Sequence, residues 1–330
     1  MGPLPNAGDS TGRYRSASIR ILRGRRGFSA RRTPHGLEGR LAVQCMGSRP
    51  PARARAASMD QRPPQTQSVA SLDDPRIAVY RDVADRQLDR LAGRFIAEGR
   101  LVVERLLESD YTAESVLLAE RRVAGVLPLV PPDVPVYVAA QRLVERIVGF
   151  RFHSGVIACG LRRDTPSLDD VAPGWAEDVT LAVLPDIANT ENLGGLLRIS
   201  AAFGADAVVL GPSCCDPFYR QAVRVSMGTV FSLPLVRSKD LAADLERLRE
   251  KWHVELAAAV LDGDAEPLSR ARRGRRLGLL FGNEATGLAP EHVALCDRKI
   301  TVPMKLGADS LNVAVAAAVF LHHFTTCGAF

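Results

Sequence analysis

Short apolar runs alternate with helical patterns from Asp178 to the C-terminus of the chain. Each run is rich in Val, Leu or Ala, and most are followed by a segment whose apolar residues recur at helical spacing. This alternation predicts a doubly wound α/β domain, in which a parallel sheet carries helices on both faces. The expected strands are residues 179–185, 206–211, 230–236, 254–260, 276–282 and 300–304.

The loops that follow three of these runs hold most of the small polar residues. They read DIANTENLGG, FGNEATG and KLGADSLN, and each joins the end of an apolar strand to the next segment. A doubly wound sheet binds its ligands beyond the carboxyl ends of its strands, so these loops are candidates for a ligand site. No GxGxxG follows the first strand and no Walker A motif occurs, which argues against an ordinary dinucleotide or nucleoside triphosphate site. For the third loop, an alternative is a Ser N-cap on a core helix.

Length and composition set the broad class of protein. A chain of 330 residues with 46% hydrophobic residues is long enough for two domains with substantial cores. The six cysteines form no CxxC pair and have no metal-ligand spacing with the histidines, so we expect reduced, structural thiols and no metal site. No apolar run reaches the length of about 20 residues that a membrane-spanning helix needs. We therefore expect a soluble cytoplasmic protein without a membrane partner.

The positive charge is concentrated in residues 1–74. This segment has 13 Arg, no Lys and 5 acidic residues, a balance of +8, so the rest of a chain with net charge +6 carries −2. It is also rich in Pro, Ser and Gly, which predicts disorder. Three explanations fit: an organelle transit peptide, an RNA-holding tail, or a mistaken start with Met59 as the true first residue.

Residues 75–164 have the pattern of a smaller α/β unit. We expect a helix, a turn at Gly93 and a second helix within residues 82–109, followed by strands at 116–119, 134–139 and 156–159. Five arginines of this unit are candidates for phosphate contacts or for ordinary solvated charge: Arg142, Arg146, Arg151, Arg162 and Arg163. Residues 165–177 contain prolines and acidic residues without periodicity, and we interpret them as a linker to a domain of residues 178–330.

Several strings of the larger domain closely resemble a known family. They are NLGGLLRISAAFGADAVVL, LGLLFGNEATGLAPEHVALCDRKITVPM and DSLNVAVAAAVFL, in that order along the chain. They are similar to the three motifs of the SpoU (TrmH-like) RNA ribose 2′-O-methyltransferases of the SPOUT superfamily. Residues 76–163 also resemble the family's ribosomal-protein-like substrate-binding domain. The resemblance implies a deep trefoil knot at the C-terminal end of the sheet, a rare exception to ordinary connectivity.

The resemblance also implies which residues bind the cofactor and act in the reaction. S-adenosylmethionine is expected to contact the knot loops, largely through backbone groups, at Gly282, Asn283, Gly287, Val302, Met304 and Leu311. The residues implied at the reacting centre are Asn192, Arg198, Glu284, Ser310 and Asn312. We assign Glu284 a structural role, because a carboxylate near polyanionic RNA is better placed on backbone N–H groups that hold the knot.

Arg198 poses a chemical problem, because arginine is often proposed as the base in this family. A guanidinium is always protonated and offers no acceptor atom. We therefore favour a role in which Arg198 grips the neighbouring phosphate and stabilises the forming alkoxide, while the proton leaves to phosphate or water. A helix that begins near Glu191 places Arg198 about two turns inside it.

The function expected from this resemblance is methyl transfer from S-adenosylmethionine to a ribose 2′-hydroxyl of structured RNA, with rRNA favoured over tRNA. The alternative is a non-catalytic RNA-binding or ribosome-assembly factor that keeps the fold. The apolar run VAVAAAVFL near the C-terminus is expected to lie against the knot and in a homodimer contact. The adjacent pair Cys214 and Cys215 lies outside the motifs, and we interpret it as packing at a strand end.

Overall fold

The computed structural model describes residues 64–83, 93–306 and 309–327. They belong to one compact unit of the chain, residues 51–330. Most of the predicted leader, and the first helix predicted within 82–109, lie outside the described residues. None of the described helices combines the length and the apolar character that crossing a membrane requires.

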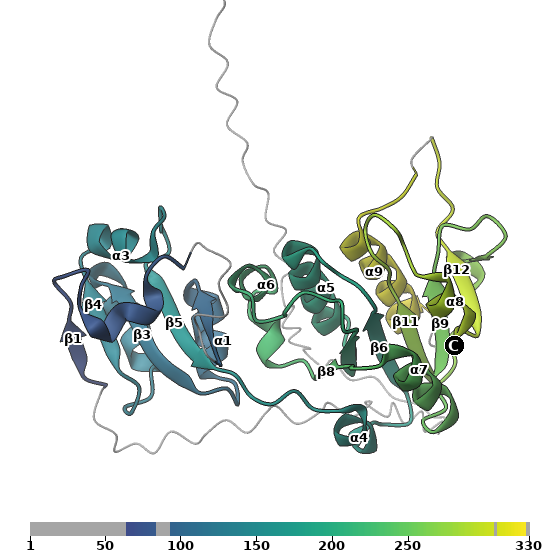
Figure 1. Ribbon diagram of the computed structural model, residues 1–330, viewed down its shortest axis with the longest axis horizontal. Helices are drawn as coiled ribbons and strands as arrows, with labels where there is room; N and C mark the ends of the chain where they lie inside the picture. Colours follow the sequence, from purple (N-terminus) through teal and green to yellow (C-terminus); the bar gives the residue numbers. More distant parts are fainter. Residues whose placement is uncertain (1–63, 84–92, 307–308, 328–330) are drawn as a thin grey trace, which may run out of the picture. The chain divides into compact units, whose positions relative to one another are not determined.

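A sheet of seven parallel strands forms the core of the larger domain (Figure 1). Its order is β10-β12-β9-β11-β6-β7-β8, and every neighbouring pair runs parallel. The strands are β6 Val179–Leu184, β7 Ala207–Leu210, β8 Leu235–Arg237, β9 Glu255–Ala259, β10 Glu266–Pro267, β11 Arg276–Leu280 and β12 Arg298–Thr301. The predicted parallel α/β architecture is confirmed.

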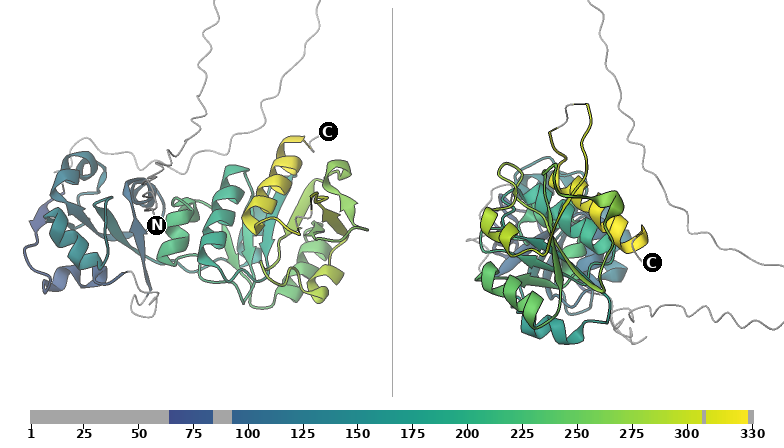
Figure 2. Two further views of the ribbon diagram at one scale, coloured as in Figure 1. Left: turned by 90° about the horizontal axis from the view of Figure 1, so that it is seen from above. Right: turned by 90° about the vertical axis from the view of Figure 1, so that its right-hand side faces the viewer.

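Helices cover both faces of this sheet, as the right-hand view of Figure 2 shows. On one face, buried residues of α5 (Thr190–Ala202), α6 (Arg220–Val225) and α9 (Val313–His322) pack against strand residues such as Ala182 and Leu279. On the other face, α7 (Leu241–Glu250) packs against Val183 and Leu256, together with the residues that follow α8 (Pro290–Ala294). Strand side chains alternate between the two faces, which is why every residue of β6 is buried.

A second, mixed sheet of five strands forms the smaller domain, in the order β1-β4-β3-β5-β2. Strands β1, β4 and β3 are parallel, and β5 is antiparallel to both β3 and β2. The strands are β1 Thr66–Ser68, β2 Arg94–Glu98, β3 Ala113–Ala119, β4 Val136–Ala139 and β5 Val156–Leu161, and the helices are α1 Arg100–Leu107, α2 Val123–Val126 and α3 Gln141–Val148. α3 packs on one face of this sheet and α1 on the other.

Three expectations about local structure need correction. Strand β1 lies inside the segment 1–74 for which disorder is predicted, because it is a short polar strand held by pairing with β4 and carries no apolar pattern. The predicted turn after Gly93 continues as strand β2, whose Phe95, Ile96 and Ala97 are buried against β5. The expected strand 230–236 begins as a 3₁₀ turn, Thr229–Phe231, and only Leu235–Arg237 joins the sheet.

The predicted linker 165–177 contains regular structure. Ser167 caps the short helix α4 (Leu168–Val171) through a capping box with Asp170, and a 3₁₀ turn, Ala172–Gly174, follows. Leu168 is buried in the same cluster as α7. The segment is therefore packed onto the larger domain along part of its length.

Candidate active site

The strand order of the large sheet reverses between β6 and β11. From β6 the chain continues to β7 and β8 on one side, whereas β9 and β12 lie beyond β11 on the other. Val183 of β6 is paired with Leu280 of β11, so the loops that follow these two strands begin side by side. Reversal points of this kind are where doubly wound sheets bind ligands. Two of the three polar loops thus start at the place where a ligand is expected.

A chain of side-chain hydrogen bonds joins all three loops. The Nδ2 of Asn192 donates to Oε1 of Glu284 at 2.5 Å, and the Nδ2 of Asn312 donates to Oδ1 of Asn192 at 2.9 Å. Residues separated by 92 and 120 positions in the sequence are therefore in direct contact. Asn192 lies at the centre and uses both ends of its amide, so the three predicted residues form one polar cluster. The expected partner of Glu284 is corrected: its carboxylate accepts from the side-chain amide of Asn192, and no backbone N–H of the described residues donates to it.

The FGNEATG loop is closed on itself. Asn283 and Gly287 exchange backbone hydrogen bonds of 2.9 Å, and the Oδ1 of Asn283 accepts from the N–H of Ala285 at 2.9 Å. Gly287 adopts φ +71°, a backbone conformation that favours glycine. A Cβ on Gly282 would lie 2.3 Å from the carbonyl carbon of Gly287 and 2.4 Å from the nitrogen of Leu288. The loop therefore requires glycine at both positions.

The first polar loop contributes two residues that the sequence analysis did not single out. Asn189 caps α5, and its Oδ1 accepts from the N–H groups of Glu191 and Asn192 at 2.8 and 3.2 Å. Asp186, directly after the β6–Pro185 segment, accepts from Nδ2 of Asn283 at 3.3 Å. An Asn immediately before a helix start is an N-cap signal, and it could have identified Asn189.

The third loop ends at the N-terminus of α9, and the cap there is Asn312. Its Oδ1 accepts from the N–H groups of Ala314 and Val315 at 2.9 and 3.4 Å. The alternative of a Ser N-cap is therefore wrong: the helix does have an N-cap, but the capping residue is Asn312 and not a serine. Ser310 is exposed, as is Leu311 at 38%. Because its side-chain oxygen accepts from the helix and its amide nitrogen donates to Asn192, Asn312 holds the helix end and the cluster together.

Two further residues proposed for the cofactor follow β12. Val302 is partly buried against the core cluster, and Met304 is partly exposed two residues later. Together with exposed Leu311 they are apolar side chains on the segment between β12 and α9. This set of residues suits a ligand with an aromatic base, a ribose and a short amino-acid chain, as S-adenosylmethionine has.

Arg198 lies about two turns from Thr190, the first residue of α5, which agrees with its predicted position. Its side chain is exposed and makes no hydrogen bond or ion pair with any residue that the structure describes. Long helical side chains lean toward the helix N-terminus, here the edge of the sheet that carries the polar cluster. Arg198 is thus available to an anionic ligand.

The cysteine pair after β7 packs at a strand end, as predicted. Cys214 is buried, donates from Sγ to the carbonyl of Leu184 at 2.9 Å and accepts from the N–H of Ile187 at 3.3 Å. Burial raises the pKa of the Cys214 thiol, so it stays protonated near neutral pH. These bonds fix the segment between β6 and α5 that carries Asp186.

Comparisons with known proteins agree with the motifs. A model of the SpoU rRNA Methylase family matches residues 180–322. An uncharacterized tRNA/rRNA methyltransferase of Mycobacterium bovis is 38% identical over 270 residues, which cover 79% of this chain and 92% of that protein. The 23S rRNA (guanosine-2′-O-)-methyltransferase RlmB of Escherichia coli is 29% identical over 234 residues, which cover 66% of this chain and 93% of RlmB.

Solved structures give the same assignment. An AdoMet-bound rRNA methyltransferase from Sinorhizobium meliloti superposes with a TM-score of 0.65 at 26% identity, and the match covers 78% of this chain and 96% of that one. The SpoU methyltransferase AviRb from Streptomyces viridochromogenes, at 22% identity and a TM-score of 0.64, shares the fold over 75% of this chain and 95% of its own. The chain therefore belongs to the SpoU family of RNA ribose 2′-O-methyltransferases, enzymes that take their methyl group from S-adenosylmethionine.

Proposed function

We propose that the chain methylates a ribose 2′-hydroxyl in structured ribosomal RNA. The observation that carries the proposal is the hydrogen-bonded cluster of Glu284, Asn192 and Asn312 at the reversal point of the sheet. It unites residues from all three family motifs. The rRNA substrates named for relatives such as RlmB favour rRNA over tRNA, as does the resemblance of the smaller domain to the family's substrate-binding domain.

The proposed mechanism is an in-line displacement at the methyl carbon. The sulfonium of bound S-adenosylmethionine supplies an activated methyl group. The protein must align the ribose hydroxyl and stabilise the charge that develops on its oxygen. Asn192, Asn312 and Ser310 are neutral hydrogen-bonding groups that can orient the ribose without repelling phosphate. Arg198 grips the adjacent phosphate and stabilises the forming alkoxide, and the proton leaves to phosphate or water.

Two features of the fold belong to the same proposal. We infer from the family resemblance that the segments after β11 and β12 form a trefoil knot, and the contacts of Glu284 and Asn312 with Asn192 support this inference. We also infer a homodimer through α9, because Val315 and Val319 are 50% and 39% exposed on an otherwise apolar helix. We further propose that the chain consists of an Arg-rich leader, an RNA-binding domain, a linker and a methyltransferase domain. We also propose a cytoplasmic location.

The experiment that tests this function is a map of 2′-O-methylation across total RNA from cells with and without the gene. We expect one or a few rRNA positions to lose the modification when the gene is deleted. A loss confined to tRNA would contradict the rRNA assignment. Binding of S-adenosylmethionine by calorimetry, with no methyl transfer to any RNA, would instead support the non-catalytic alternative.

Substitutions of Glu284 separate its charge from its hydrogen bond. Glu284→Gln keeps an oxygen that can accept from Asn192, so we expect methyl transfer within about threefold of wild type. Glu284→Ala leaves the Asn192 amide without this acceptor, and we expect a loss of about tenfold. The measurement is the single-turnover rate of methyl transfer. A Gln variant as impaired as the Ala variant would mean that the carboxylate charge itself is required.

A further inference from the structure

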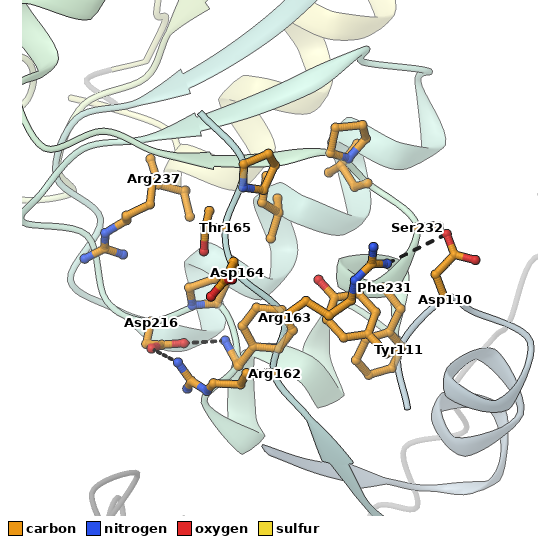
Figure 3. A pocket seen from close by; sticks show the side chains of 17 residues that line it. Asp110, Tyr111, Arg162, Arg163, Asp164, Thr165, Asp216, Phe231, Ser232 and Arg237 are labelled. Carbon is orange, nitrogen blue, oxygen red and sulfur yellow. Dashed lines mark hydrogen bonds and ion pairs between the residues drawn. The ribbon is translucent and has the colours of Figure 1, made fainter. Parts of the chain in front are cut away.

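A cavity of about 430 Å³ lies outside the proposed methyl-transfer site (Figure 3). Its size is within the range of about 300 to 1,000 Å³ that is usual for small-molecule sites. Its walls come from the segment before β3, the segment after β5, the end of β7, β8, and the segment 216–234 that joins these two strands. Apart from Leu210, the last residue of the first motif string, neither the motifs nor the proposed reaction uses these residues.

Aromatic rings form one side of the cavity. Phe218 and Phe231 are only 7% and 6% exposed and are fixed in the core, whereas Tyr111 is partly exposed. The ring of Tyr111 lies 5.5 Å from that of Phe218 and 5.7 Å from that of Phe231. Base stacking on aromatic side chains is a sequence-tolerant source of affinity for RNA, and Tyr111 is the partly exposed ring of this group.

The three arginines of the cavity already have partners. Arg162 pairs with Asp216 at 2.7 Å, and Arg163 lies 3.8 Å from Asp110 and over the ring of Tyr111. Arg237 donates to the backbone carbonyls of Pro212, Cys214 and Cys215. Because these charges are balanced by carboxylates and carbonyls, the cavity is poorly suited to a phosphate.

The polar groups at the rim suit a nucleobase better. Asp164 and Thr165 line the cavity, are exposed, and have no side-chain hydrogen bond to a residue in the described ranges. Ser232 is also exposed there, and its hydroxyl, which donates to the carbonyl of Thr229 at 3.2 Å, can still accept a hydrogen bond. A carboxylate accepts from the ring N–H or exocyclic amino groups of a base, and hydroxyls both donate and accept. Aromatic walls with a few such groups are how unpaired bases are recognised in RNA.

The cavity is also connected to the methyl-transfer loops. Leu210 and Arg237 are the last residues of β7 and β8, so this wall is on the edge of the sheet where the polar cluster lies. The loop after β7 is tied to the loop after β6 by the bond from the N–H of Cys215 to the carbonyl of Ile187, at 2.9 Å. An RNA strand that places one ribose at the polar cluster could therefore extend along this edge to the cavity.

We propose that this cavity binds an unpaired nucleobase of the RNA substrate, hydrogen-bonded to the rim residues Asp164, Thr165 and Ser232. The base stacks on Tyr111 in the place that the exposed side chain of Arg163 occupies in this structure. The inference rests on the proposed function, because it assigns a second contact to the same substrate. It predicts that the enzyme prefers a target next to a single-stranded nucleotide and not one within a continuous duplex.

The first test measures binding of a single-stranded RNA hexanucleotide that carries one 2-aminopurine, whose fluorescence falls when the base stacks. Ser232→Trp places a large ring at the cavity rim and is expected to weaken binding about tenfold. Its control is Ser269→Trp, since Ser269 is exposed and does not line the cavity. Equal affinity of the two Trp variants would overturn the inference. Thermal unfolding of both variants shows whether either substitution disturbs the fold.

A second test separates the ring of Tyr111 from its hydroxyl. Tyr111→Phe keeps the stacking surface and should retain the 2-aminopurine quenching, whereas Tyr111→Leu should lose most of it. In the wild-type protein, a hexanucleotide with 4-thiouridine should crosslink to cavity residues, and crosslinks confined to other surfaces would contradict the proposal. If these results hold while no RNA is methylated, the base site stands and the proposed function fails. If RNA is methylated while Ser232→Trp binds the hexanucleotide as wild type does, the proposed function stands and the base site fails.

Discussion

Replacement of Gly282 by Ala is expected to abolish the binding of S-adenosylmethionine that calorimetry can measure. The added Cβ would lie 2.3 Å from the carbonyl carbon of Gly287 and 2.4 Å from the nitrogen of Leu288, both backbone atoms. No rotamer change can relieve contacts of this kind, so the FGNEATG loop must shift as a whole. A displacement of about 1 Å in a catalytic constellation costs about 100-fold in rate, and we expect at least that loss of methyl transfer.

The effect of Gly282→Ala can be distinguished from general destabilisation. Gly263 is a matched control, because a Cβ there would meet nothing within 4 Å and its backbone φ is not positive. We expect Gly263→Ala to bind S-adenosylmethionine with wild-type affinity by calorimetry and to unfold at the wild-type temperature. We expect Gly282→Ala to remain folded at the assay temperature, although its strained loop lowers the unfolding temperature. Wild-type affinity in Gly282→Ala would show that this loop does not contact the cofactor.

The sequence was most informative where the pattern of burial is strict. A parallel strand covered by helices on both faces must be apolar throughout, and β6, β7 and β11 were therefore recognisable as runs of Val, Leu and Ala. The loops with small polar residues could be placed at one edge of the sheet because parallel strands all end there. The contact of Asn192 with both Glu284 and Asn312 needs tertiary structure, since no local rule relates residues so distant in sequence.

The errors share a physical cause, because they occur where pairing or packing decides the structure and composition does not. β1 is polar and is a strand only because β4 offers hydrogen-bonding partners. The sequence around β2 predicts a turn because Gly93 and Gly99 flank a run of only five residues. The cap of α9 is Asn312 and not Ser310, because the helix begins at Val313, directly after Asn312. The cavity lined by Tyr111 and Phe231 combines segments that no motif links.

The substitution Arg198→Lys is expected to lower the single-turnover rate of methyl transfer about tenfold, and Arg198→Ala about 100-fold or more. Lysine keeps the positive charge but loses the planar fork that grips a phosphate through two parallel hydrogen bonds. The side chain of Arg198 has no partner within the described part of the chain, so its replacement breaks no contact there and should leave the unfolding temperature unchanged. The measured rate therefore reports the function of the side chain and not the stability of α5.

The pH dependence of the lysine variant tells a cation from a base. A lysine that acts as a cation is effective below its pKa of about 10.4, so the rate of the variant should fall as the pH rises toward about 10. The wild-type enzyme should not show this fall, because a guanidinium stays charged over this interval. A lysine that acts as a base would give a rate that rises over the same interval. Arg272→Lys is the control, because Arg272 is exposed and precedes β11 at the opposite edge of the sheet. An Arg198→Lys rate equal to that of the control would exclude both the two-bond grip on phosphate and a base role for Arg198, and would leave the Asn192 cluster as the remaining group for orienting the ribose.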